Sequence, residues 1–148
     1  MLSFLVFEGD RPQAERVLRH AHILGPESVP ISGEVRFEHG VIHCAKPTNE
    51  SGALGIQVGL DQQPLDALGL ATGTDDGETG VPGLLGQLTL RTCLLPERER
   101  PYLLSLELAR HRLMLYLNKL EDWNLSALGG DHKITRLFER ARLAFTRA

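Results

Sequence analysis

Hydrophobic and polar residues alternate in short runs over the first part of the chain, and the pattern changes to helical spacing near Ser105. Alternation with a period of two is typical of strands with one buried face. Apolar residues at i, i+3, i+4 and i+7 are typical of an amphipathic helix. The sequence therefore predicts a β-rich part over residues 1–93 and two helices over residues 105–148.

The predicted strands are short and apolar or alternating, and they cover residues 3–7, 16–24, 33–37, 41–45, 52–60 and 87–93. The run 16–24 has no clean two-faced pattern but has the length of a strand. The clearest pair is a hairpin of residues 33–37 and 41–45. Its loop is predicted to be the three residues Glu38, His39 and Gly40, with the glycine supplying a positive φ at the third position.

The first predicted helix covers residues 106–123, with Ser105 as its N-cap and an apolar stripe that reaches Trp123. Because the stripe is broad, we expect this helix to be the central element of the core. A second helix follows Gly129 and Gly130 and is predicted to be capped by Asp131. The predicted fold class is α+β: an antiparallel β-sandwich or jelly-roll-like module followed by a C-terminal helical hairpin packed on the sheet.

Residues 61–86 are rich in glycine and aspartate and have no apolar period, so they predict a mobile surface loop. The run 73–80 within it could be taken for a phosphate loop or a calcium loop. It has neither the lysine that the first requires nor the distant glutamate that closes the second. A flexible insertion explains it best.

The length of 148 residues and the hydrophobic content of 42% indicate one globular domain over residues 1–148. The formal net charge of -3 is too small to predict a nucleic-acid or membrane partner. No positive residue precedes the short apolar run at the N-terminus, as a signal peptide would require, so we expect a cytoplasmic protein. Cys44 and Cys93 form no CxxC pair and are predicted to be small hydrophobic residues.

The candidate chemistry is sparse, because the sequence contains no nucleophile elbow, HExxH motif or Walker-type loop. His20 and His22 would point the same way on a strand, but such a pair is only half of a metal site. We therefore expect no metal and no cofactor. A polar site built from His20, His22, Arg19 and Arg91 stays open. The last helix is basic, and its exposed Arg136 and Arg140 are candidates for an interface.

The run RTCLLPERERPYLL, which starts at Arg91, is followed by Glu107-Leu108-Ala109-Arg110 and by Trp123. With the apolar opening and the hairpin of residues 33–44, it resembles the N-terminal non-catalytic domain of bacterial proteins similar to family 10 glycoside hydrolases of the xylanase type. The resemblance implies a β-rich module, closed by helices, that precedes a (β/α)₈ barrel. The catalytic glutamates of the barrel have no counterpart here, so the resemblance gives no residue a catalytic role.

Two functions follow as alternatives. The first is a non-catalytic interaction or structural module that packs on a downstream barrel or self-associates. The second, which the xylanase-type resemblance suggests, is a carbohydrate-binding module for plant-type or microbial polysaccharide. Sugar binding usually requires exposed aromatic rings, and Tyr102 is the one aromatic residue that the pattern leaves outside the core. The candidate ligand or interface residues are Tyr102, Arg91, His20, His22, Arg136 and Arg140.

Overall fold

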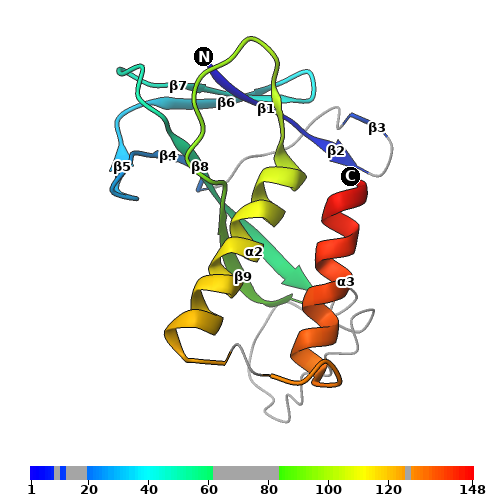
Figure 1. Ribbon diagram of the computed structural model, residues 1–148. Helices are drawn as coiled ribbons and strands as arrows, with labels where there is room; N and C mark the ends of the chain where they lie inside the picture. Colours follow the sequence, from blue (N-terminus) through cyan, green and yellow to red (C-terminus); the bar gives the residue numbers. More distant parts are fainter. Residues whose placement is uncertain (9–10, 13–19, 62–83, 126–127) are drawn as a thin grey trace.

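The computed structural model describes residues 1–8, 11–12, 20–61, 84–125 and 128–148. Within them, the strands form two four-stranded sheets and a short two-stranded ribbon, and two helices complete the fold (Figure 1). The described strands close no barrel, and the two C-terminal helices pack on the sheet as a pair. The fold is therefore of the predicted α+β class.

The first sheet has the strand order β10-β1-β7-β6. Strand β1 (Leu2–Leu5) lies in the middle, parallel to β10 (Tyr102–Leu103) and antiparallel to β7 (Val41–Ala45). Strand β6 (Glu34–Glu38) pairs with β7 at the edge. The parallel β1–β10 pair brings the segment just before the first helix against the N-terminal strand, so it fixes where that helix starts.

The second sheet is antiparallel and has the order β5-β4-β8-β9. Its longest pairing joins β8 to β9, the strand that leads toward the helices. A separate ribbon joins β2 to β3. The bounds of these strands are β5 (Pro30–Ile31), β4 (His22–Leu24), β8 (Ala53–Asp61), β9 (Leu84–Arg91), β2 (Phe7–Glu8) and β3 (Arg11–Pro12).

The core lies between the two sheets and takes side chains from both. The fully buried residues with the largest side chains are Phe4, Leu2 and Ile42 from the first sheet and Ile23 and Leu54 from the second. Each such side chain stabilises the fold by about 1.5–3 kcal/mol on burial. Cys44 is buried in the same cluster. Burial raises the pKa of the Cys44 thiol to about 12, so the group stays neutral and packs as the predicted small hydrophobic residue.

The hairpin of β6 and β7 is confirmed, but its turn is shorter than predicted. Glu38 pairs with Val41, which leaves a two-residue turn of His39 and Gly40 with φ of 49° and 81°. Two positive φ values in succession define the type I′ turn that matches the twist of adjacent strands. The prediction of a three-residue loop was wrong because His39 adopts the left-handed conformation, which glycine was expected to adopt alone.

The prediction of a strand over residues 16–24 was wrong at His20. This residue has a φ of 52° and precedes β4, which begins at His22. His20 and His22 are therefore not successive same-side residues of one strand. Residues 16–19 lie outside the described residues. The predicted loop 61–86 is shorter at both ends, since Asp61 belongs to β8 and residues 84–86 to β9, and residues 62–83 lie outside the described residues.

Both helices start at positions other than those predicted. Helix α2 (Leu104–Asp122) has Leu103 as its N-cap residue without a side-chain hydrogen bond, so Ser105 lies inside the helix. Helix α3 (Lys133–Arg147) is capped by His132, whose Nδ1 accepts a hydrogen bond from the backbone N–H of Ile134 at 3.3 Å, and not by Asp131. Trp123 is the C-cap residue of α2 and is 65% exposed, so the predicted apolar stripe does not end in the core.

Because the sheets and not α2 hold most of the fully buried side chains, we predict unequal costs for two leucine truncations. Leu54→Ala should lower the free energy of unfolding by about 2–5 kcal/mol, as large-to-small changes at fully buried leucines do. Leu117→Ala, on the outer side of α2, should lower it by about 1 kcal/mol or less. Urea denaturation of both variants measures this difference, and equal losses would show that α2 is the central element of the core after all.

Candidate interaction surface

Helix α2 is buried on a narrow strip only. Among its residues Leu104, Glu107 and His111 are fully buried, at the spacing of one face. Leu104 joins the core between the sheets, and Leu108 packs against that core. Met114, one turn after His111, is 42% exposed, and Leu117 on the outer side is 45% exposed. The helix is therefore anchored along one line and leaves much of its apolar surface uncovered.

Helix α3 has an apolar face but no fully buried residue. It contacts α2 through the stacked rings of Tyr116 and Phe138, whose centroids are 4.7 Å apart. A second contact places the Arg110 guanidinium 6.0 Å from the centre of the Phe145 ring. An amphipathic helix gains its stability from packing of its apolar face, so α3 rests on few contacts for its length.

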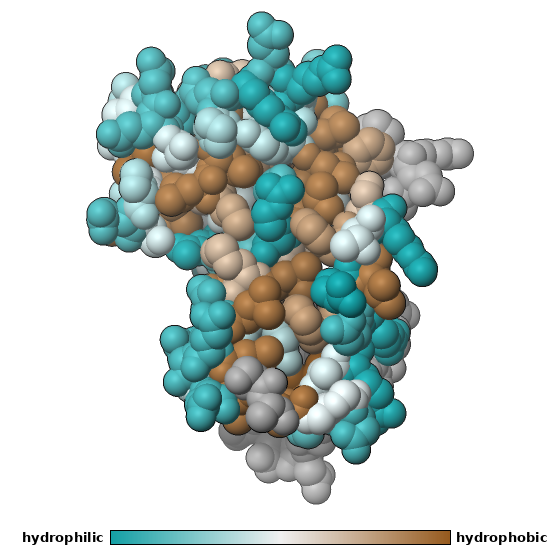
Figure 2. Space-filling model, in the orientation of Figure 1, coloured by the Kyte–Doolittle hydropathy of each residue, from teal (hydrophilic) through white to brown (hydrophobic). Residues whose placement is uncertain are grey.

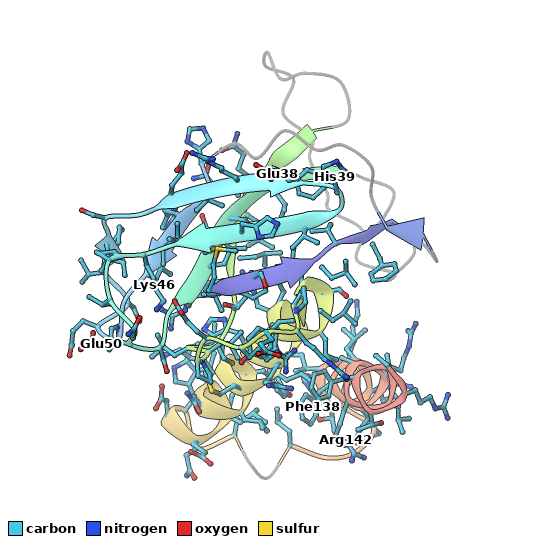
Figure 3. All side chains as sticks on the ribbon, turned by 90° about the horizontal axis from the view of Figure 1, so that it is seen from above. Glu38, His39, Lys46, Glu50, Phe138 and Arg142 are labelled. Atoms are coloured by element: carbon cyan, nitrogen blue, oxygen red, sulfur yellow. The ribbon has the colours of Figure 1, made fainter. Side chains whose placement is uncertain are left out.

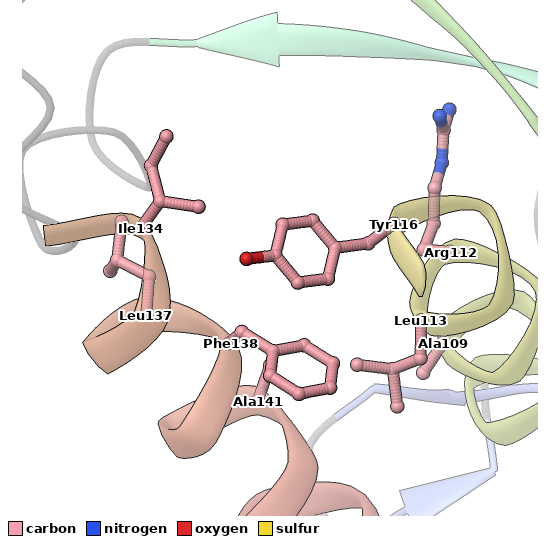
Figure 4. Close-up of a pocket in the computed structure, with 8 residues that line it drawn as sticks. All are labelled: Ala109, Arg112, Leu113, Tyr116, Ile134, Leu137, Phe138 and Ala141. Atoms are coloured by element: carbon pink, nitrogen blue, oxygen red, sulfur yellow. The ribbon is translucent and has the colours of Figure 1, made fainter. Parts of the chain in front are cut away.

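A hollow of about 400 Å³ lies between the two helices (Figure 4). In Figure 4, the rings of Tyr116 and Phe138 extend between the helices, and the aliphatic side chains of both helices surround them. Figure 2 shows apolar residues along the same seam. The hollow has an almost entirely apolar lining, in which Arg112 is the charged residue. The lining residues are Ala109, Arg112, Leu113, Tyr116, Ile134, Leu137, Phe138 and Ala141. Two helices that packed closely would leave no such hollow.

Three exposed arginines line one side of α3. Arg140 and Arg147 follow Arg136 by four and eleven residues, which places all three on one stripe of a helix. Leu143, 46% exposed, lies on the same stripe. A second hollow, of about 460 Å³, borders it and is lined by Leu137, Arg140, Ala141, Leu143, Ala144 and Arg147. Basic residues thus flank an apolar surface that the described part of the chain does not cover.

Figure 3 labels Phe138, which lies toward α2, and Arg142, which follows it by one turn on a neighbouring position of α3. Arg142 forms an ion pair with Glu139 at 2.6 Å, one turn earlier on α3. Both side chains are about half exposed, so this pair contributes little to stability. The charge of Arg142 is locally compensated, and the positive stripe consists of the three arginines named above.

Tyr102 lies in the core, so the prediction that it is free for a ligand was wrong. It is 7% exposed, and its hydroxyl donates a hydrogen bond to the carbonyl of Pro96 at 3.0 Å. Its ring lies 6.0 Å from that of Phe4, and the Arg98 guanidinium lies 3.5 Å above it. The cause is the parallel pairing of β10 with β1, which carries Tyr102 inward. The residue cannot stack on a sugar.

The predicted polar site of His20, His22, Arg19 and Arg91 is assembled only in part. His22 of β4 pairs with Gly55 of β8, and Gly55 pairs in turn with Arg91 of β9. His22 and Arg91 therefore share one face of the second sheet. The His22 ring covers Gly55, where an added Cβ would lie 2.7 Å from His22 Nε2. His20 is exposed before the strand, and Arg19 lies outside the described residues.

His111 is the residue that the sequence interpretation missed. It is 3% exposed, and its Nε2 accepts a hydrogen bond of 2.7 Å from Arg91 Nε. Arg112 adds a second contact from α2 to β9, donating to the carbonyl of Thr89 at 2.7 Å. The available signal was the position of His111, four residues after Glu107 and seven after Leu104, on the buried face of the helix. These two hydrogen bonds fix α2 on β9.

No protein-family model, curated protein or solved structure matches this chain. The resemblance described above therefore stays a prediction. Among the described residues, no group of three or more His, Cys, Asp or Glu side chains is arranged to hold a metal ion. No helix in the described ranges is long and apolar enough to span a bilayer.

We predict that His111 makes the fold sensitive to mild acid. Burial lowers the pKa of His111, and the nearby charges of Arg91 and Arg112 lower it further. The unfolded chain, with an ordinary histidine pKa of about 6.5, then binds more protons than the folded chain below that pH. The free energy of unfolding should therefore fall as the pH is lowered from neutral through the unfolded-state pKa toward the folded-state pKa.

Denaturation over this pH range measures the effect. His111→Gln, which keeps a neutral acceptor for Arg91, should flatten the pH dependence. The control His39→Asn replaces an exposed histidine with a residue that tolerates a left-handed φ, and it should keep the wild-type dependence. An unchanged slope in the His111 variant would mean that another group causes the acid sensitivity.

Proposed function

We propose that this chain is a non-catalytic accessory domain that binds a protein surface through the outer faces of α2 and α3. The observation that supports the proposal most directly is α3 itself, an amphipathic helix with no fully buried residue. Beside it lie an apolar hollow and exposed Leu117, Ile134 and Leu143. Apolar patches rimmed by charged residues are typical of protein–protein interfaces.

The charges of α3 favour a partner with carboxylates over a symmetric second copy. A two-fold dimer places the same patch of both copies in contact. Such a contact through α3 would bring Arg136, Arg140 and Arg147 near their own counterparts, and like charges at an interface are costly. A downstream catalytic barrel, which the resemblance to the xylanase-type proteins suggests, has no such restriction. On this proposal the domain is the accessory part of a glycoside hydrolase-like protein.

Binding of a polysaccharide is not proposed as a second function. The aromatic residue that was to stack on the sugar, Tyr102, is buried against Phe4 and Arg98. Of the remaining candidates, Arg136 and Arg140 belong to the α3 surface, and Arg91 is held by His111. Trp123, the C-cap residue of α2, is an exposed ring at 65%, with Lys119 Nζ 5.8 Å from its centre. None of the candidate ligand residues belongs to α2 beside it, so no polar site accompanies this ring.

The proposal predicts that one exposed leucine controls association. Leu143→Glu places a carboxylate among the α3 arginines and should weaken binding to the partner by about tenfold or more, the effect expected when an apolar interface residue becomes charged. Val29→Glu, at a position 58% exposed beside β5, is the matched control and should bind as wild type does. Both substitutions are at exposed positions and should leave the melting temperature nearly unchanged.

The experiment has two arms that correspond to the two partners. Sedimentation velocity over a wide concentration range detects a second copy. Calorimetric titration with the barrel encoded downstream in the native gene detects the accessory role. Binding of the barrel that Leu143→Glu weakens and Val29→Glu preserves would support the proposal. Self-association through α3, or a barrel that does not bind, would contradict it.

A further inference from the structure

A cavity separate from the α2–α3 surface lies between the second sheet, the segment after β9 and the middle of α2. Its volume is about 300 Å³. Its apolar lining residues are Leu24, Ala53, Leu94 and Met114. Arg91, Thr92, Cys93 and His111 contribute polar groups, and Gly25 and Ser28 from the β4–β5 turn complete the lining.

The strongest indication of a ligand is a buried donor without an acceptor. His111 is 3% exposed, and its Nε2 accepts from Arg91 Nε at 2.7 Å. An arginine Nε always carries a hydrogen, so Nε2 must present its lone pair and the ring proton lies on Nδ1. That Nδ1 has no hydrogen-bond partner in the structure. A buried N–H without an acceptor is costly, and a ligand that accepts from it would remove the cost.

The other polar groups of the cavity are also donors or are already paired. The Thr92 hydroxyl accepts from the backbone N–H of Leu54 at 3.0 Å and donates to the carbonyl of Cys93 at 2.9 Å. Burial raises the pKa of the Cys93 thiol, so the group stays uncharged. Arg91 supplies a positive charge. The cavity therefore offers donors and a cation to a ligand and no unpaired carboxylate of its own among its described lining residues.

One carboxylate, that of Glu107, lies close to Cys93 of the cavity lining. Glu107, one turn before His111 on α2, has Oε2 3.1 Å from Arg110 Nη1, an ion pair by distance without hydrogen-bond geometry. Glu107 does not line the cavity. Glu107 acts on Cys93 of the lining together with Arg110 and Arg91, and Arg91 and Arg112 act on His111, so three cations and one carboxylate lie within electrostatic reach of the cavity. The local field therefore favours an anion.

We propose that this cavity binds a small monoanion of the aliphatic carboxylate class, with the carboxylate at Arg91 and His111 and the hydrocarbon part against Leu24, Ala53 and Met114. A guanidinium forms charge-assisted hydrogen bonds with a carboxylate, and the N–H of His111 supplies a second donor. The apolar wall distinguishes such an acid from inorganic phosphate, which would bring no group to pack on it. The site is independent of the proposed docking surface.

Calorimetric titration with hexanoate, hexanamide and inorganic phosphate at neutral pH tests the proposal. Hexanoate should bind saturably, and hexanamide, which has the same chain without the charge, should bind about tenfold or more weakly. Arg91→Gln should weaken hexanoate to the level of the amide. Equal binding of hexanoate and hexanamide, tighter binding of phosphate than of hexanoate, or no binding of any of them would overturn the proposal.

Because Arg91 also holds α2, its variant can fail to fold, and a second pair of variants avoids that difficulty. Met114→Trp fills the cavity from a position 42% exposed, and Leu117→Trp makes the same kind of change on the same helix, outside the cavity and at 45% exposure. Met114→Trp should abolish hexanoate binding, and Leu117→Trp should leave it unchanged. Wild-type affinity in Met114→Trp would refute the assignment of the site to this cavity.

Discussion

The arrangement of the helices depends on the junction between α2 and strand β9. There Arg91 Nε donates to the buried His111 Nε2, and Arg112 donates to the Thr89 carbonyl, both at 2.7 Å. His111 is buried, so removing Arg91 would leave its Nε2 without water or protein to replace the bond. The Arg112–Thr89 hydrogen bond is exposed and adds a second point of attachment between α2 and β9. The junction holds α2 along one line and so decides which of its faces stays uncovered.

Two surfaces follow from that position. On the inner side, the helix and the end of the second sheet enclose the cavity that contains Arg91 and His111. On the outer side, α2 receives α3 over a short ring contact, and an apolar hollow and three arginines are left exposed. The first surface offers donors in a confined space and is suited to a small anion. The second is open and amphipathic and is suited to a protein. They share α2 but no lining residue.

The sequence predicted what local periodicity determines and missed what distant pairing determines. The alternation from residue 87 and the turn glycine Gly40 were enough to predict a strand and a hairpin, because both depend on neighbours in the chain. The strand itself, β9, begins before residue 87 and ends at Arg91, two residues before the predicted end. The inward position of Tyr102 depends on parallel pairing of β10 with β1, where Tyr102 pairs with Phe4, far away in the sequence. The Arg91–His111 contact joins a strand to a helix twenty residues away. The apolar stripe predicted α2 but could not show that the sheet covers only part of it.

Native-state hydrogen exchange tests most directly the claim that the helical face is incomplete without a partner. If it is, the amides of α3 should open with a free energy well below that of global unfolding, while those of β1 and β8, which flank the fully buried core, should exchange only by global unfolding. Helix α2, held at β9, should lie between them. Protection of α3 equal to that of β1 and β8 in the isolated chain would show that its few contacts suffice, and would contradict the account.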